Sequence, residues 1–267
     1  LRGKAGSICV MDIYTGEIIA MNSAPSFDPN MFLYGMNEKK WKEMQKDKLK
    51  PLLNKTISGL YSPGSTIKPI VALSALENDL VRTDMNVRCN GKIEMYGHTY
   101  HCWKKKGHGN VTLKNAIKQS CDIYFYELAR ILGVDRLNIT ANKFGLGNKV
   151  LGEFYSNEKK GLVPSTKWKK QELDENWYLG ETFITGIGQG YIQSNPLQLC
   201  LMTAQLANGG HKIYPKIVVD NNQLSYEQIK EKINNQIKES KKKDNFLIKS
   251  TEEFLKPKVK DYAPLYR

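Results

Sequence analysis

The chain has 267 residues, of which 40% are hydrophobic, so it can bury a substantial core in one domain with a lobe or in two closely packed domains. Its net charge is +13, and the lysines cluster at residues 38–50, 158–170 and 230–260. These stretches lack the interleaved aromatic residues and the recognition helix that are typical of nucleic-acid-binding proteins. We therefore expect no nucleic-acid partner. No run approaches the roughly 18 to 20 apolar residues that span a bilayer, and the start is not a signal peptide, so any anchor is expected outside this chain.

Residues 6–22 predict a β-hairpin, because two β-rich segments flank a turn at residues 14–16. The lysine-rich residues 38–50 follow and are expected at the surface.

The segment from Ser65 to Lys68 places a hydroxyl and an amine three residues apart, directly after a Pro-Gly pair and before a strongly apolar run. A buried helix is predicted to begin at the serine, with Pro69 in its first turn, where a missing amide costs little. Since residues three apart share a helix face, the Lys68 nitrogen is expected within hydrogen-bond reach of the Ser65 oxygen, as in a serine nucleophile with a lysine base. The alternative is a helix cap at Ser65 and a surface lysine.

The same Ser-x-x-Lys pattern occurs at Ser156/Lys159 and at Ser240/Lys243. Both copies lie in polar, lysine-rich segments with no apolar helix behind them, so we expect them to be solvated surface.

Residues 87–110 predict an irregular or hairpin-like insertion, and residues 111–132 predict a helix in two pieces that meet near Ser120. A lysine base usually needs a third group to relay its proton. The Ser120-Cys121-Asp122 triplet supplies a hydroxyl at this helix break, although capping residues are the alternative interpretation.

Three thiols and an imidazole in this region form a set of the kind that binds tetrahedral zinc: Cys89, Cys102, His108 and Cys121. A disulfide between Cys89 and Cys102 is the alternative, and His98 and His101 are reserve ligands. Of the two remaining cysteines, Cys9 lies in a predicted strand and Cys200 in an apolar run. Both are expected to be small core residues.

Residues 185–190 are rich in glycine but lack a dinucleotide fingerprint, and the sequence has no Gly-Lys-Ser/Thr, which excludes a phosphate loop. A helix is predicted from Pro196 to residues 208–210. Residues 224–239 predict an amphipathic surface helix, and beyond Lys241 a basic, weakly patterned region is expected to be mobile.

Together, the Ser65 to Lys68 motif and the Ser120 to Asp122 motif about fifty residues later resemble the penicillin-recognising serine transpeptidases. Residues 6–29, 61–69, 186–190 and 195–199 resemble class B penicillin-binding proteins in particular. The likeness runs from about residue 5 to about residue 217. The segment 103–109, the Ser-Cys-Asp triplet and Trp177-Tyr178 look most like the elongation-type member, penicillin-binding protein 2.

This resemblance implies an α+β fold, the sandwich-like transpeptidase fold of penicillin-binding proteins and serine β-lactamases. The family's third motif, Lys-Ser/Thr-Gly, occurs nowhere in the sequence. We therefore expect residues 1–267 to be a partial, C-terminally truncated transpeptidase domain of impaired activity, with residues 218–267 forming a basic, helical or mobile region.

The resemblance also implies acyl transfer on peptidoglycan stem peptides ending in D-Ala-D-Ala. Ser65 would be the nucleophile and neutral Lys68 its base, which requires a pKa about three units below the reference value. Ser120 would pass the proton to the leaving amine and Asp122 would orient the neighbouring hydrogen bonds. Some elongation-type relatives carry a metal at about the place of the cysteine–histidine set, and no organic cofactor is implied.

The implied location is the periplasmic face of the bacterial inner membrane, with β-lactams as inhibitors and membrane proteins of the elongation machinery as partners. Two alternatives remain open at this point. One is a D,D-carboxypeptidase or β-lactamase that uses the same first two motifs, and the other is a non-catalytic, zinc-containing binding module.

Overall fold

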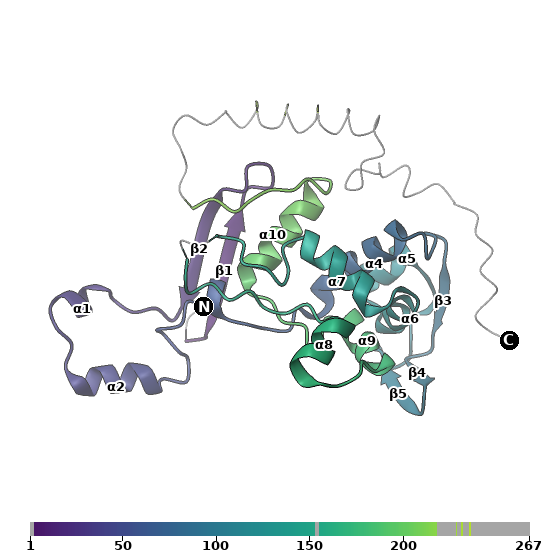
Figure 1. The fold of residues 1–267 in the computed structure, drawn as a ribbon, viewed down its shortest axis with the longest axis horizontal. Coiled ribbons are helices and arrows are strands. Elements are labelled where there is room, and N and C mark those ends of the chain that lie inside the picture. Colours follow the sequence, from purple (N-terminus) through teal and green to yellow (C-terminus); the bar gives the residue numbers. More distant parts are fainter. Residues whose placement is uncertain (1–2, 153–154, 218–227, 229–230, 232–234, 236–267) are drawn as a thin grey trace. The chain divides into compact units, whose positions relative to one another are not determined.

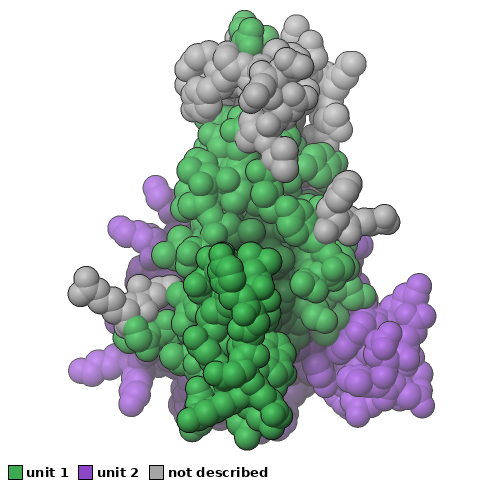
Figure 2. Space-filling model, turned by 90° about the vertical axis from the view of Figure 1, so that its left-hand side faces the viewer, with its two compact units in different colours: residues 1–62, 142–163, 193–238 green, residues 63–141, 164–192, 239–267 purple. Residues whose placement is uncertain are grey.

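The computed structural model describes residues 3–152 and 155–217, together with positions 228, 231 and 235. The chain divides into two compact units, each assembled from segments far apart in the sequence (Figure 1). Figure 2 colours them separately: the first unit comprises residues 1–62, 142–163 and 193–238, and the second comprises residues 63–141, 164–192 and 239–267. Apart from the three single positions, the helix expected at 224–239 and the region 218–267 lie outside the described residues.

The first unit begins with the predicted hairpin, in which β1 (Gly6–Met11) pairs antiparallel with β2 (Ile18–Ala24). The Asp12 carboxylate holds the turn by accepting hydrogen bonds from the backbone N–H groups of Tyr14 and Thr15. Gly16 has a φ of +76°, and a Cβ there would collide with the Tyr214 carbonyl, so only glycine lets these two backbone segments meet.

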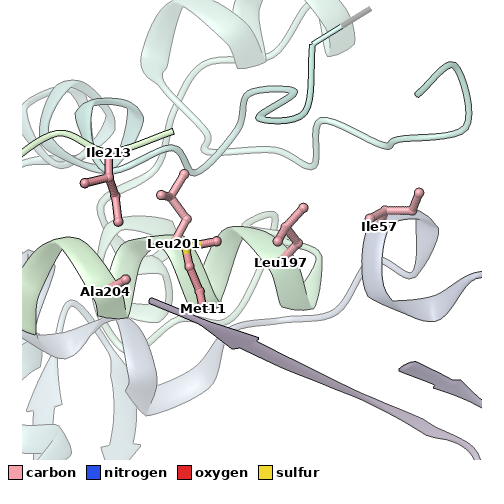
Figure 3. Close-up of a cluster of buried hydrophobic side chains, with 6 residues drawn as sticks. All are labelled: Met11, Ile57, Leu197, Leu201, Ala204 and Ile213. Atoms are coloured by element: carbon pink, nitrogen blue, oxygen red, sulfur yellow. The ribbon is translucent and has the colours of Figure 1, made fainter. Parts of the chain in front are cut away.

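The helices of this unit among residues 3–152, 155–163 and 193–217 are α1 (Asn30–Leu33), α2 (Glu38–Lys46), α3 (Lys55–Ser58) and α10 (Pro196–Ala207). The last of these begins where the proline predicted it and packs against β1, while α3 packs against both strands. Between these elements lies an apolar cluster whose members are Met11, Ile57, Leu197, Leu201, Ala204 and Ile213 (Figure 3). The hairpin and the two helices therefore share one core.

The elements of the second unit are a 3-10 turn (Gly64–Ile67), α4 (Lys68–Glu77), β3 (Asn86–Cys89), β4 (Lys92–Met95), β5 (His98–His101), β6 (Gly109–Thr112), α5 (Leu113–Gln119), α6 (Asp122–Leu132), α7 (Val134–Lys143), α8 (Thr166–Leu173) and α9 (Leu179–Gly186). At its centre is α6, which packs against α4, α9 and β3. Most of its side chains are buried, because DIYFYELARIL is apolar nearly all round.

The expected α+β class is confirmed, and several element boundaries need correction. The α-helix after Ser65 begins only at Lys68, since the preceding turn is 3-10. The 87–110 insertion is more regular than expected and forms two antiparallel ladders, β3 with β6 and β4 with β5. Residues 111 and 112 belong to β6, so the first helical piece begins at Leu113. Among the described residues, no helix has the length and apolar character to cross a bilayer.

The cap of α10 generates a stability prediction. The buried Asn195 side chain accepts from the Gln198 N–H and donates to the carbonyls of Ile57 and Lys159. We expect Asn195→Ala to lower the free energy of unfolding by about 2–4 kcal/mol, because it removes a cap and leaves buried polar groups unpaired. The matched control is Asn37→Ala at the exposed cap of α2, where only Lys40 N–H is lost and about 1 kcal/mol is expected. Urea titration measures both, and equal losses would contradict this account.

Candidate active site

Lys68 is the most deeply buried of the four predicted catalytic residues, with only 2% of its side chain exposed. Its Nζ donates to the Ser120 carbonyl oxygen at 3.0 Å, to Ser120 Oγ at 2.9 Å and to Asp122 Oδ1 at 2.7 Å. An ammonium group has three N–H donors, and all three are used here. The structure thus brings together three of the four predicted catalytic residues around one buried charge.

The burial of Lys68 is stabilised by its ion pair with Asp122, since an unpaired ammonium group would be costly to remove from water. Nζ also lies 5.3 Å from the centre of the Phe125 ring. Asp122 is the first residue of α6, a position where the helix dipole favours a carboxylate. Its second oxygen, Oδ2, accepts a hydrogen bond from the Trp103 backbone N–H.

Ser120 occupies the break between α5 and α6 and has left-handed backbone angles, φ 51° and ψ 47°. A serine in this conformation is strained by about 1–3 kcal/mol and persists only where its surroundings hold it. The Trp103 indole helps to stabilise this conformation, because its Nε1 donates to the carbonyls of Gln119 and Ser120. The helix break expected from the sequence is therefore a defined turn that presents the Ser120 hydroxyl to Lys68.

Ser65 is exposed and lines a cleft of about 620 Å³ within the second unit. Site residues and neighbours from the insertion and the glycine-rich segment share this lining: Ser65, His101, Cys102, Trp103, Ser120, Asp122, Tyr126, Ile187 and Gln189. The hydroxyl of Tyr126 donates to the His101 carbonyl. Burial raises the pKa of Tyr126, so this side chain contributes an uncharged phenol to the cleft. A cleft of this size is in the usual range for a small ligand.

One expected contact is not formed. Among the hydrogen bonds of the described residues, none joins Lys68 to Ser65, because the three donors of Lys68 are taken by Ser120 and Asp122. In addition, Ser65 lies in a 3-10 turn and not in the α-helix on which the spacing argument relied. The expected contact between Lys68 and Ser65 is therefore wrong, and the catalytic roles of the two residues stay predictions.

The glycine-rich segment positions the cleft through its backbone. The Gly64 N–H donates to the Gly188 carbonyl at 2.8 Å, and a Cβ on Gly188 would collide with the Gly64 carbonyl. Gly186 in turn packs against Ala129 of α6, where a Cβ would also collide. Sequence reasoning missed this role and the cleft residues Trp103, Tyr126, Ile187 and Gln189. The signal available was the density of glycine at 186–190, which marks close approach of backbones.

The predicted cysteine–histidine set is assembled in the second unit. The ligand atoms of Cys89, Cys102, His108 and Cys121 all lie within 4.8 Å of one another. His108 Nδ1 is 3.5 Å from the sulfur of Cys89 and from that of Cys102. The reserve ligands His98 and His101 are not members of this group.

The chemistry of this group fits a tetrahedral metal with sulfur and nitrogen ligands. The three sulfurs are buried, and burial, followed by the nearby Lys104 charge, lowers the pKa of His108, which keeps the imidazole in its neutral, ligating form. Burial raises the pKa of the Cys102 and Cys121 thiols, so a bound cation would be needed to stabilise their thiolates.

Of the other two Ser-x-x-Lys copies, only the one at Ser156 lies among the described residues. Ser156 and Lys159 are both exposed, as expected, and Ser240 and Lys243 lie outside the described residues.

Comparison with known proteins agrees with this geometry. Residues 6–250 match the family described as the penicillin binding protein transpeptidase domain. The peptidoglycan D,D-transpeptidase MrdA of Acinetobacter baumannii is 40% identical over 220 residues, which are 82% of this chain and 33% of that protein. The Escherichia coli K12 protein of the same name is 34% identical over 82% of this chain and 35% of its own length. The chain thus spans about a third of the length of these curated relatives.

Solved structures give the same result. Pseudomonas aeruginosa PBP2 in complex with WCK 5153 is 40% identical, with a TM-score of 0.76 over 88% of this chain and 55% of that one. Helicobacter pylori PBP2, in its complex with MreC, is 34% identical, with a TM-score of 0.77 over 88% of this chain and 45% of that one. The resemblance to elongation-type penicillin-binding protein 2 is confirmed.

The close approach of Gly188 to Gly64 generates a prediction about the turn that carries Ser65. We expect Gly188→Ala to slow the acylation of Ser65 by a fluorescent penicillin about 100-fold, since displacing the turn by about 1 Å misplaces the nucleophile. Gly190→Ala is the matched control. Its φ of +75° equals that of Gly188 within a degree, but its nearest contact is the flexible Ile184 side chain at 3.3 Å, so near-normal labelling is expected. Equal rates for the two variants, both checked for folding by circular dichroism, would refute this role.

Proposed function

This chain belongs to the family of penicillin-binding protein transpeptidase domains, and on that premise we propose that it carries a peptidoglycan D,D-transpeptidase centre with Ser65 as nucleophile. The observation that carries the proposal is the placement of the buried Lys68 amine against Ser120 Oγ and Asp122, one turn beyond an exposed serine that opens on a cleft. A solvated surface lysine beside a helix cap would have none of these partners.

In the proposed acylation step, Ser65 Oγ attacks the penultimate carbonyl of a stem peptide ending in D-Ala-D-Ala. The Lys68 ammonium group first releases one proton to solvent, and the resulting neutral amine, which gives up one of its present hydrogen bonds, accepts the Ser65 proton. The tetrahedral oxyanion collapses to an ester on Ser65. The leaving amine of D-Ala takes a proton through the Ser120 hydroxyl, which already contacts Nζ.

In the second step, an amine from a neighbouring stem peptide attacks the ester and regenerates Ser65 with formation of the cross-link. Asp122 keeps the amine of Lys68 directed at Ser120 through both steps. Trp103 and Tyr126 supply aromatic walls of the cleft along which a peptide can lie. The same ester forms with a β-lactam, whose ring amide mimics the scissile bond.

We propose that the protein acts at the periplasmic face of the inner membrane, where peptidoglycan is cross-linked. The partners would be membrane proteins of the elongation machinery, supported by the solved complex of Helicobacter pylori PBP2 with MreC. No nucleic-acid partner is proposed, in keeping with the sequence.

We also propose that Cys89, Cys102, His108 and Cys121 hold one structural zinc ion. When bound, zinc would supply the charge that stabilises buried thiolates, and it would link the insertion to the helix break that carries Ser120. The support is the convergence of four ligand atoms within 4.8 Å, three of them in buried side chains.

The nucleophile is tested by labelling the natural protein, at its full expressed length, with a fluorescent penicillin. We expect Ser65→Ala to abolish labelling without loss of stability, because the side chain is exposed. Ser156→Ala is the internal control, since it removes the hydroxyl of a second, exposed Ser-x-x-Lys and should label normally. If the Ser65→Ala protein is still labelled, the assignment of Ser65 as nucleophile is wrong.

The second half-reaction separates a transpeptidase from a hydrolase. A transpeptidase transfers the acyl group to an added D-amino acid or stem-peptide amine, which mass spectrometry of the products detects. Turnover of a chromogenic β-lactam with release of hydrolysed product only would favour the carboxypeptidase or β-lactamase interpretation.

The metal proposal predicts one zinc per chain by elemental analysis of protein purified without added metal. We expect His108→Ala to lose the zinc, and chelation to lower the melting temperature of the wild-type protein by about 10 °C. Cys200→Ser changes a cysteine that is not a member of the group and belongs to the first unit, so this variant should retain the zinc. Metal-free protein with Cys89 and Cys102 oxidised to a disulfide would overturn the proposal.

A further inference from the structure

Two cysteines that the proposed function does not use meet in the first unit. Cys9 lies on β1 and Cys200 on α10, and these two elements pack against each other. The Cys200 thiol donates to the Cys9 carbonyl oxygen at 3.7 Å, and the two side chains are close enough to shift each other's pKa. They join segments separated by almost the whole described chain.

The surroundings of this pair differ from those of the other three cysteines. Cys9 and Cys200 are half-buried, whereas Cys89, Cys102 and Cys121 are buried. Both members of the pair line an apolar groove of about 440 Å³ and pack against the cluster of Met11 and Leu201. A small reagent can therefore reach them from solvent without opening the core.

The proximity of the two thiols makes their pKa values unequal. Interaction with the Cys9 thiol lowers the pKa of Cys200, and interaction with Cys200, together with burial, raises the pKa of Cys9. Thiolate is the reactive species in disulfide exchange, so Cys200 is the first thiol of the pair to attack.

We propose that Cys9 and Cys200 form a reversible intramolecular disulfide by exchange with an oxidised thiol compound such as glutathione disulfide or an oxidised dithiol protein. The Cys200 thiolate attacks one sulfur of the donor disulfide and releases one thiol. Cys9, after losing its proton, attacks the Cys200 sulfur of the mixed disulfide and releases the second thiol. The pair loses two electrons and two protons, and the donor gains them as two thiols.

The bond would fasten the N-terminal hairpin to α10 covalently. It would close a loop from residue 9 to residue 200, and cross-links that close long loops restrict the unfolded chain most strongly. The hairpin is otherwise attached to the helix by the shared apolar cluster (Figure 3) and by the hydrogen bond from Asn208 Nδ2 to the Ile13 carbonyl. Oxidation would thus stabilise the first unit, and reduction would loosen it.

The experiment equilibrates the natural protein in buffers of increasing ratio of oxidised to reduced glutathione, followed by acid quenching, alkylation and peptide mass spectrometry. We expect a Cys9–Cys200 cross-linked peptide that appears as the ratio rises and disappears with dithiothreitol. The melting temperature should rise by roughly 5–10 °C on oxidation. Peptide mapping keeps this pair distinct from oxidation of the buried cysteine group.

Cys9→Ser and Cys200→Ser are the controls, and neither should show the oxidative rise in melting temperature. Cys9→Ser should in addition accumulate the mixed disulfide of Cys200 with glutathione, because the resolving thiol is gone. The proposal is overturned if wild-type protein also stops at that mixed disulfide, or if both thiols stay alkylatable at every ratio. The mass spectra of the wild-type protein decide this even if a variant fails to fold.

Discussion

The active-site arrangement depends on one buried ammonium group. Lys68 Nζ lies in the protein interior with all three donors satisfied, and all three acceptor atoms belong to Ser120 and Asp122, more than fifty residues further along the chain. Its burial as an ammonium group is stabilised by the ion pair with Asp122. The start of α4 and the break between α5 and α6 must therefore stay in register, and this electrostatic requirement joins two segments that local propensity alone would leave independent.

Backbone conformation also determines where the residues of the site lie. Ser120 is held in a left-handed conformation, and its carbonyl is shared by Lys68 and the Trp103 indole. Gly188 allows one backbone to touch another at Gly64, directly before Ser65. Ser65 and Ser120 are thus both placed by strained or side-chain-free positions, where small substitutions can have large effects.

The elements that could be predicted from the sequence are those whose signals are local. The hairpin at residues 6–22 follows from alternation and a turn, and α10 follows from a proline at its first position and Asn-Gly-Gly at its end. Spacing also identified Ser65, Lys68 and the helix break at Ser120. Spacing could not determine the resting partner of Lys68, because that choice depends on acceptors brought in by tertiary folding. The cleft walls formed by Trp103 and Tyr126 were missed for the same reason. Helices α7 and α8 were missed because their sequences are polar on average, although α7 buries Val134, Leu137 and Ala141.

The cysteine–histidine group and the relay share their backbone, and this has a mechanical consequence. Cys102 directly precedes Trp103, whose N–H and indole hold Asp122 and Ser120. Cys121 lies between Ser120 and Asp122 themselves. If the four ligand atoms move closer together or further apart, Ser120 and Asp122 should move with them. The movement passes through Trp103, which follows Cys102, and through the α5–α6 turn, which contains Cys121. The separation of the Ser120 hydroxyl from the Lys68 amine is consequently coupled to the packing of a group that takes no part in the proton transfer.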